Sequence, residues 1–208
     1  MTEQPGGLAA DGTASLEVRW IVAGRLASGM PEWFGRFPAA MESREDSYLL
    51  DPQLHGLAVK VRAAGALDVK VYGGSPGTLE VADRVRGRIE AWRKWSFPCG
   101  PIGHQRSDPA GWMPIRKSRR ISQFSLASGT ARPHLPGPGE EPGCAVELTE
   151  FLAAGQAWWS LGFEATGPAR LLRDELEAAA ALVFAQALPG GLELGAADSR
   201  SYVEWLRG

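Results

Sequence analysis

Basic side chains alternate with apolar ones in several segments of this chain. A spacing of two residues places the basic groups of one segment on the same face of a β-strand. Guanidinium and ammonium groups are strong hydrogen-bond donors to oxyanions. If such faces meet on the inside of a closed sheet, they surround an anion. The basic residues with this placement are Arg19, Lys60, Arg62, Lys70, Lys117 and Arg119.

Two interpretations of these charged faces are open from the sequence. An ordinary antiparallel sheet turns them to water, where they need no special chemistry. A sheet closed into a barrel turns them inward, and helices then cover the apolar outer face. The basic run at 116–120 is divided in either case, because Lys117 and Arg119 share one face while Arg116 and Arg120 share the other.

Short, turn-rich links between the alternating segments predict antiparallel neighbours. One long helix is expected from Pro168 to about Leu188, and residues 199–206 are expected to dock back onto the body. Residues 23–44 indicate a packed loop or short helix, 73–77 a turn, 98–111 a loop and 127–143 an irregular, proline-rich connection. The strands are expected at 15–22, 44–50, 56–62, 67–72, 88–97, 112–126, 144–151 and 156–166.

The composition is typical of a soluble globular protein, with 44% hydrophobic and 22% charged residues. We expect one domain over residues 15–208, preceded by a disordered leader at 1–14. The net charge of -2 argues against nucleic acid and anionic membranes as partners. No secretory signal is recognisable, so we expect a cytoplasmic protein in which Cys99 and Cys144 are free thiols.

The order of these segments resembles the CYTH, or triphosphate tunnel, superfamily. The resemblance rests on the first strand at 15–22, on 46–51, on the strand with Lys60 and Arg62, on the strand with Lys70, and on later segments. Those later segments are 88–90, 117–119, 146–148, 161–164 and 201–206. The resemblance covers most of the chain from Ser15 onward. It implies an α+β fold, an antiparallel β-barrel tunnel of about eight strands with flanking helices.

The resemblance also implies a chemistry. The superfamily includes triphosphatases, thiamine triphosphatases and class IV adenylyl cyclases, which grip a triphosphate with basic residues and hold Mg²⁺ or Mn²⁺ with glutamates. A triphosphate suits such a site, because its several negative charges need cations for neutralisation. The substrate-binding residues implied here are the six basic residues named above, and no catalytic residue is assigned. The implied metal ligands are Glu17, Glu164, Glu90 and Glu147.

This chain departs from the superfamily at two acidic positions. The family's first strand carries Glu-x-Glu-x-Lys, and aligning Glu17 with the second glutamate and Arg19 with the lysine leaves Ser15 in place of the first. The late Glu-x-Glu pair is also reduced, with Gly162 ahead of Glu164. Both losses weaken the predicted metal site.

Three functions are therefore predicted as alternatives. The first is a metal-dependent phosphohydrolase that acts on a triphosphate. The second is a tunnel that binds a small phosphorylated anion without turning it over. The third is an interaction module whose polar tunnel is only structural. The natural ligand and the oligomeric state do not follow from the sequence.

Overall fold

The computed structural model describes residues 12–63, 65–99, 111–127, 129–137 and 141–208. Within these ranges the chain forms nine strands, three α-helices and two short 3-10 helices at Pro189–Gly191 and Ala196–Asp198. The α-helices are α1 (Met30–Phe34), α2 (Leu172–Val183) and α3 (Tyr202–Arg207). The strands are β1 (Thr13–Ala23), β2 (Ala40–Leu49), β3 (Leu57–Arg62), β4 (Ala66–Val81), β5 (Val85–Pro98), β6 (Trp112–Ala127), β7 (Thr130–His134), β8 (Gly143–Ala153) and β9 (Gln156–Thr166).

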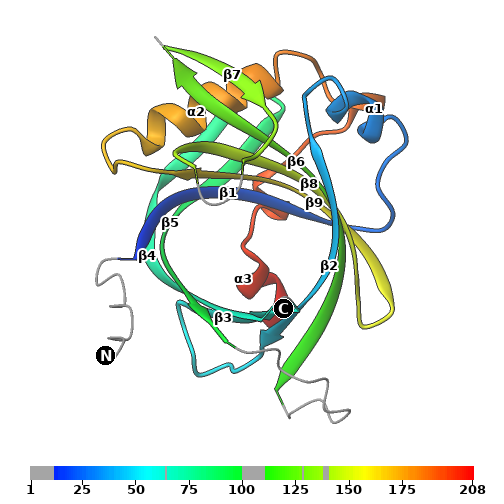
Figure 1. Ribbon diagram of the computed structural model, residues 1–208. Coiled ribbons are helices and arrows are strands. Elements are labelled where there is room, and N and C mark those ends of the chain that lie inside the picture. The colour runs from blue at the N-terminus through cyan, green and yellow to red at the C-terminus, as the bar shows by residue number, and fades with distance from the viewer. Residues whose placement is uncertain (1–11, 64, 100–110, 128, 138–140) are drawn as a thin grey trace.

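Eight of these strands close into an antiparallel barrel. The order around it is β2-β3-β4-β5-β1-β9-β8-β6, and β6 pairs back with β2 from Ala40↔Ile121 to Leu49↔Trp112. β7 is a ninth strand that pairs with the end of β6. Figure 1 looks through the ring that these strands form. The predicted α+β fold, an antiparallel barrel with flanking helices, is confirmed.

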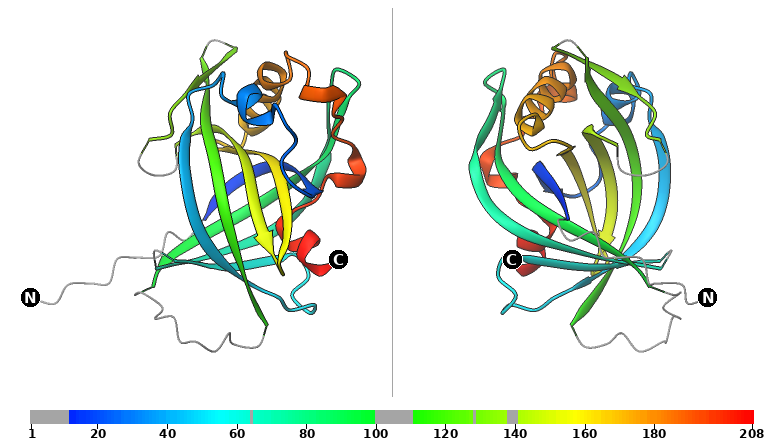
Figure 2. Two further views of the ribbon diagram at one scale, coloured as in Figure 1. Left: turned by 90° about the vertical axis from the view of Figure 1, so that its right-hand side faces the viewer. Right: turned by 60° about the vertical axis from the view of Figure 1, so that its left-hand side comes forward.

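The two faces of each strand have different surroundings, as the alternation predicts. On β1, Val18 and Trp20 point outward into the main apolar core and are 1% and 0% exposed. Helices α1 and α2 cover this outer face on the β1, β8 and β9 side (Figure 2). Glu17 and Arg19 point to the inside of the barrel, with side chains 15% and 12% exposed. The interpretation that these charges face bulk water is wrong for β1.

The helices leave another part of the barrel wall uncovered. Leu57, Val59 and Val61 on β3 pair with Val71, Val69 and Leu67 on β4. Their neighbours Lys60 and Lys70 line the interior, so these apolar side chains point outward. They are only half-buried, and Val71 is 41% exposed.

Helix α3 lies across one end of the barrel (Figure 1, red). Ser201 caps it, since its Oγ accepts a hydrogen bond of 3.2 Å from the Glu204 N–H. Its Tyr202 and Trp205 pack on a second, smaller apolar cluster inside that end of the barrel. This cluster contains Ile21, Tyr48, Ile115, Phe151 and Ala153. The predicted docking of 199–206 therefore closes one mouth of the barrel.

Several predicted boundaries are wrong. Residues 73–77 are not a turn, because β4 continues through them as an irregular stretch with register shifts at Tyr72/Gly74 and Gly74/Gly77. The segment 127–143 is not wholly irregular, because it contains β7, an edge strand that tolerates Pro133. The predicted helix 168–188 is shorter, since only Leu172–Val183 is α-helical.

Two of the predicted segments lie partly or mostly outside the residues that the structure describes. Residues 1–11 of the expected leader lie outside the described residues, and β1 already begins at Thr13. Most of the predicted loop at 98–111 lies outside them as well. Both cysteines are free thiols, and Cys144 is buried. Among the helices of the described ranges, none has the length and apolar character needed to cross a membrane.

Candidate functional site

The barrel encloses a cavity of about 190 Å³. Every one of the eight barrel strands contributes side chains to its wall, and Ser201, Tyr202 and Val203 close it at the α3 end. All ten residues predicted from the sequence as substrate or metal ligands lie on this wall. They are Arg19, Lys60, Arg62, Lys70, Lys117, Arg119, Glu17, Glu90, Glu147 and Glu164.

The cavity has an excess of basic groups. Eight basic and five acidic side chains line it, although the whole chain has a net charge of -2. Asp46, which is fully buried, adds one further carboxylate beside the wall. Glu42 on β2 adds another, because it forms ion pairs with Arg44 and with Arg119. The wall itself still carries more basic than acidic side chains. This excess lies inside the barrel, where electrostatic interactions are stronger than in bulk water.

Three glutamates lie side by side at one part of the wall. Glu17 on β1 pairs directly with Glu90 on β5 and with Glu164 on β9. Lys70 reaches across from β4, and its Nζ lies 2.5 Å from Glu17 Oε1 and 2.8 Å from Glu164 Oε1. Glu90 accepts hydrogen bonds from Arg88 and from Trp92 instead. Each of these carboxylates is therefore already engaged by a donor from the protein.

A second group surrounds Glu147 on β8. The Arg19 guanidinium lies 3.3 Å from Glu147 Oε1, and Arg119 also forms an ion pair with Glu147. Arg19 occupies the space in front of Gly162, since a Cβ on Gly162 would lie 2.6 Å from the Arg19 Cζ. Position 162 is therefore a glycine at the point where the Arg19 side chain passes over the backbone.

A third group is centred on Asp46 of β2. Arg44, Lys60 and Lys117, from three different strands, lie 3.2, 3.7 and 3.7 Å from Asp46 Oδ2. Neither carboxylate oxygen of Asp46 has a hydrogen-bond partner. Lys117 instead donates to the Tyr48 hydroxyl at 2.6 Å. Arg44 also pairs with Glu42 and Lys60 with Asp68, so this group is part of a wider network of ion pairs.

Burial and neighbouring charges shift several pKa values. Burial lowers the pKa of Lys60 to about 8, despite the attraction of Asp46. Burial also lowers the pKa of Lys117 well below its usual value, and the charge of Lys60 adds to this effect. Burial opposes ionisation of Glu147 and of Glu164, but Arg119 holds the pKa of Glu147 well below its usual range and Lys70 lowers that of Glu164 to about 2.

The sequence prediction missed several residues of the wall. Arg44 and Tyr48 lie on β2, whose segment 42–46 is charged at every position but one, so the alternation is not visible. Extending the two-residue period backward from Tyr48 would have identified Arg44 and Asp46. Lys94 likewise shares the parity of Glu90 on β5. Tyr202 gives no local signal, because only the docking of α3 brings it to the cavity.

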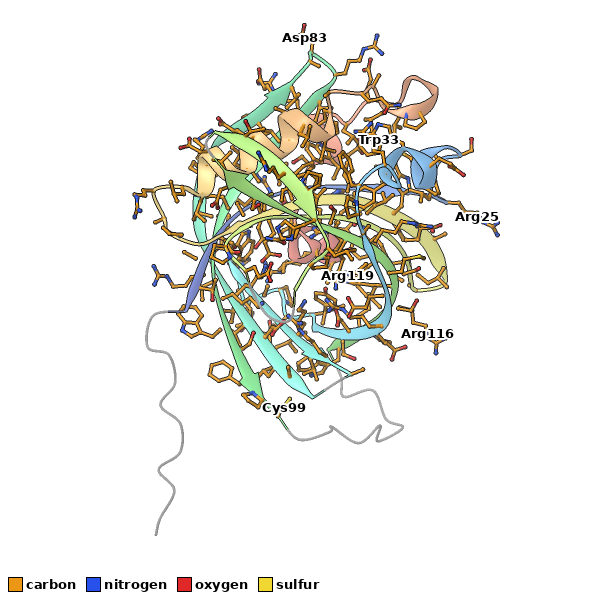
Figure 3. All side chains as sticks on the ribbon, turned by 45° about the horizontal axis from the view of Figure 1, so that its top comes forward. Arg25, Trp33, Asp83, Cys99, Arg116 and Arg119 are labelled. Carbon is orange, nitrogen blue, oxygen red and sulfur yellow. The ribbon has the colours of Figure 1, made fainter. Side chains whose placement is uncertain are left out.

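The outer half of the basic run on β6 behaves as predicted. Arg119 points into the barrel, whereas Arg116 points away from it and is 81% exposed along its side chain (Figure 3). Arg116 forms an ion pair of 2.9 Å with Glu45 on the outer face. These two arginines therefore provide a matched inner and outer pair on one strand.

The carboxylates in this arrangement do not fit a divalent metal ion. Mg²⁺ and Mn²⁺ need several oxygen ligands in octahedral geometry. The Lys70 ammonium lies between Glu17 and Glu164, the pair that the superfamily resemblance assigns to the metal. Among the residues that the structure describes, no three His, Cys, Asp or Glu side chains are grouped so that they could hold a metal.

No protein-family profile and no curated protein matches this chain. Among solved structures, the PH1819 protein from Pyrococcus horikoshii OT3 is similar, with a TM-score of 0.43 and 14% sequence identity. The alignment covers 91% of this chain and 97% of that one.

Proposed function

We propose that this barrel binds a small multivalent anion, of the size and charge of a polyphosphate, inside its cavity. The observation that carries the proposal is the excess of basic over acidic side chains on the wall of a cavity of about 190 Å³ inside the barrel. A solvent-exposed sheet would not need to bring eight basic side chains from its strands to one enclosed space. Anion binding would offset their mutual repulsion and the unfavourable burial of Lys60 and Lys117.

The basic residues would share the anion between them. Arg19 and Arg119 offer planar guanidinium groups that match oxyanion geometry, while Lys60 and Lys117 offer single ammonium groups. Arg62 and Lys70 lie on the same wall. Arg44 joins this set, because it lines the cavity and its Nε is buried without a hydrogen-bond partner.

The size of the cavity restricts the ligand. Pockets for drug-sized organic ligands measure roughly 300 Å³ or more, and this cavity measures about 190 Å³. We therefore propose that an inorganic polyphosphate, or only the phosphate end of an organic phosphate, enters the barrel. The resemblance of the strand order to the triphosphate tunnel superfamily supports the same ligand class.

A metal-dependent triphosphatase is the second candidate. The positions of Glu90, Glu17 and Glu164 on three adjacent strands are the observation behind it, although donors from the protein already engage all three carboxylates. In that case the metal would have to take the place of Lys70. Release of phosphate from tripolyphosphate with Mg²⁺ or Mn²⁺, lost in Glu17→Gln, would establish the hydrolase.

Calorimetric titration with tripolyphosphate tests the anion-binding proposal. Arg119→Gln removes an inner guanidinium, and we expect at least about a tenfold loss of affinity, as for a hydrogen bond to a charged group. Arg116→Gln removes the same charge from the outer face of the same strand, so its affinity should stay within about twofold of the unchanged protein. Equal losses in the two variants would place the anion outside the barrel. No binding by the unchanged protein would leave the charged tunnel with a structural role only.

A further inference from the structure

Lys70 lies between two carboxylates of the cavity wall. Glu17 and Glu164 are directly opposite one another on β1 and β9, so their carboxylates share one space. Lys70 comes from β4, two strands away from β1, and its Nζ forms hydrogen bonds with one oxygen of each. The side chains of Lys70, Glu17 and Glu164 are 18%, 15% and 30% exposed, so the three groups form a compact ion triplet that is partly shielded from bulk water.

At the two positions where the superfamily resemblance would place further acids, this chain has Ser15 and Gly162, and a donor group lies at each place. Ser15 Oγ donates a 2.9 Å hydrogen bond to Glu17 Oε1, the same oxygen that accepts from Lys70. The Arg19 guanidinium fills the space over Gly162. A metal ion at this place would therefore meet donors and a second cation where it needs oxygen ligands.

We propose that Lys70 is the resident cation of this cavity: its ammonium takes the place between Glu17 and Glu164 that a divalent metal ion would fill, and the anion binds without metal. A metal could enter only by displacing Lys70 from both carboxylates. That displacement leaves the mostly buried ammonium without its two carboxylates and brings it next to a doubly charged ion, which is strongly unfavourable. The part concerning the anion rests on the function proposed above, while the part concerning the metal does not.

Titration of the full-length protein with Mn²⁺ alone tests this inference, with free Mn²⁺ followed by electron paramagnetic resonance. We expect no saturable binding by the unchanged protein. Lys70→Met frees the two carboxylates, and we expect this variant to gain a saturable Mn²⁺ site. Its affinity should be at least about tenfold above the weakest binding that the titration detects. The gain should disappear in Lys70→Met combined with Glu17→Gln. Tight Mn²⁺ binding by the unchanged protein that is lost in Glu17→Gln overturns the inference.

Lys60→Met is the matched control. This substitution also removes one lysine from the cavity. Lys60 lies beside Asp46 and Asp68, however, and not between Glu17 and Glu164. We expect no gain of Mn²⁺ binding in this variant. A gain equal to that of Lys70→Met would mean that any loss of positive charge admits the metal, and it would overturn the assignment to Lys70.

Two further measurements keep the inference testable if Lys70→Met does not fold. Calorimetry of the unchanged protein with tripolyphosphate in EDTA should give the same affinity as with Mn²⁺. Binding that requires Mn²⁺ overturns the inference and leaves the anion-binding function intact. If no anion binds under either condition while the unchanged protein and Glu17→Gln both fail to bind Mn²⁺, the anion-binding function fails and the role of Lys70 stands.

Discussion

The Arg19 side chain restricts the size of the residue that position 162 can hold. The Arg19 guanidinium lies across Gly162 to reach Glu147, and any side chain at 162 would occupy the same space. Gly162 has a backbone conformation that other residues can adopt, so its lack of a side chain is a matter of room rather than of backbone freedom. The absence of a side chain at 162 and the path of the Arg19 side chain are therefore coupled.

Gly162→Ala tests this coupling. Its Cβ would force Arg19 away from Glu147, and we expect a loss of about 1–3 kcal/mol in the free energy of unfolding, as for overpacking. In an Arg19→Ala background the space is free, so the same substitution should cost less than about 0.5 kcal/mol. Urea unfolding of the four proteins measures the coupling. Additive costs in the double variant would show that Arg19 and Gly162 do not compete for space.

Lys60 is the residue through which pH should act on the cavity. Its pKa is lowered by burial to about 8, from a usual value of 10.5. Between these two values the unfolded chain holds a proton that the folded protein has lost, so the contribution of Lys60 to stability rises with pH in this window. A bound anion favours the charged lysine, and binding then takes up a proton.

Anion affinity should consequently fall as the pH rises through about 8. Sulfate is a suitable probe, because its own charge is constant in this range. We expect calorimetric affinities at pH about 9.5 to be several-fold weaker than at pH about 7. Lys60→Arg keeps its charge throughout, so its decline should be clearly smaller. An identical decline in Lys60→Arg would show that another group titrates.

At the scale of elements, α3 is a small helix with a large effect on the cavity. It has six residues, none of them fully buried, and is too short to be stable alone. Trp205 holds it in place by packing on Phe151 and Trp158, with ring centroids 5.2 and 5.0 Å apart. Glu204 forms an ion pair with Arg88 on the exposed side. Apolar docking, more than this ion pair, should keep the mouth of the barrel closed.

Comparing Trp205→Ala with Glu204→Gln tests which contact holds α3. We expect the tryptophan variant to lose about 1–3 kcal/mol of unfolding free energy, below the cost for a fully buried aromatic residue. The exposed ion pair should contribute less than about 1 kcal/mol. Both values are measured by urea unfolding. If Glu204→Gln cost as much as Trp205→Ala, the ion pair would be the main anchor.

The elements also show how far the sequence determines this fold. The strands with clean alternation, such as 15–22 and 156–166, are predicted with their inner and outer faces, because burial of an apolar face fixes strand parity. The irregular stretch at 73–77 is not, since Gly, Ser and Pro there are typical of a turn. Only pairing with β5, including a 2.8 Å hydrogen bond from Ser75 Oγ to the Ile89 carbonyl, keeps it in the sheet.

At the scale of the whole molecule, closure of the barrel separates a charged inner surface from a largely apolar outer surface. It gathers basic groups inside a protein whose net charge is -2, so the anion attraction that we propose would be local to the cavity. The sequence could predict which residues share the inner face, and all ten predicted residues lie there. It could not predict that Lys70 reaches Glu17 and Glu164, because that contact spans several strands and depends on how the barrel closes.

Diffraction from crystals grown with tripolyphosphate in EDTA tests most directly whether the anion binds inside the barrel. We predict phosphate density in the cavity, within hydrogen-bond distance of Lys60, Lys117 and Arg119, with Lys70 still between Glu17 and Glu164. Density on the outer surface alone, or an empty cavity with the ion pairs of Asp46 and Glu147 unchanged at saturating tripolyphosphate, would contradict the account.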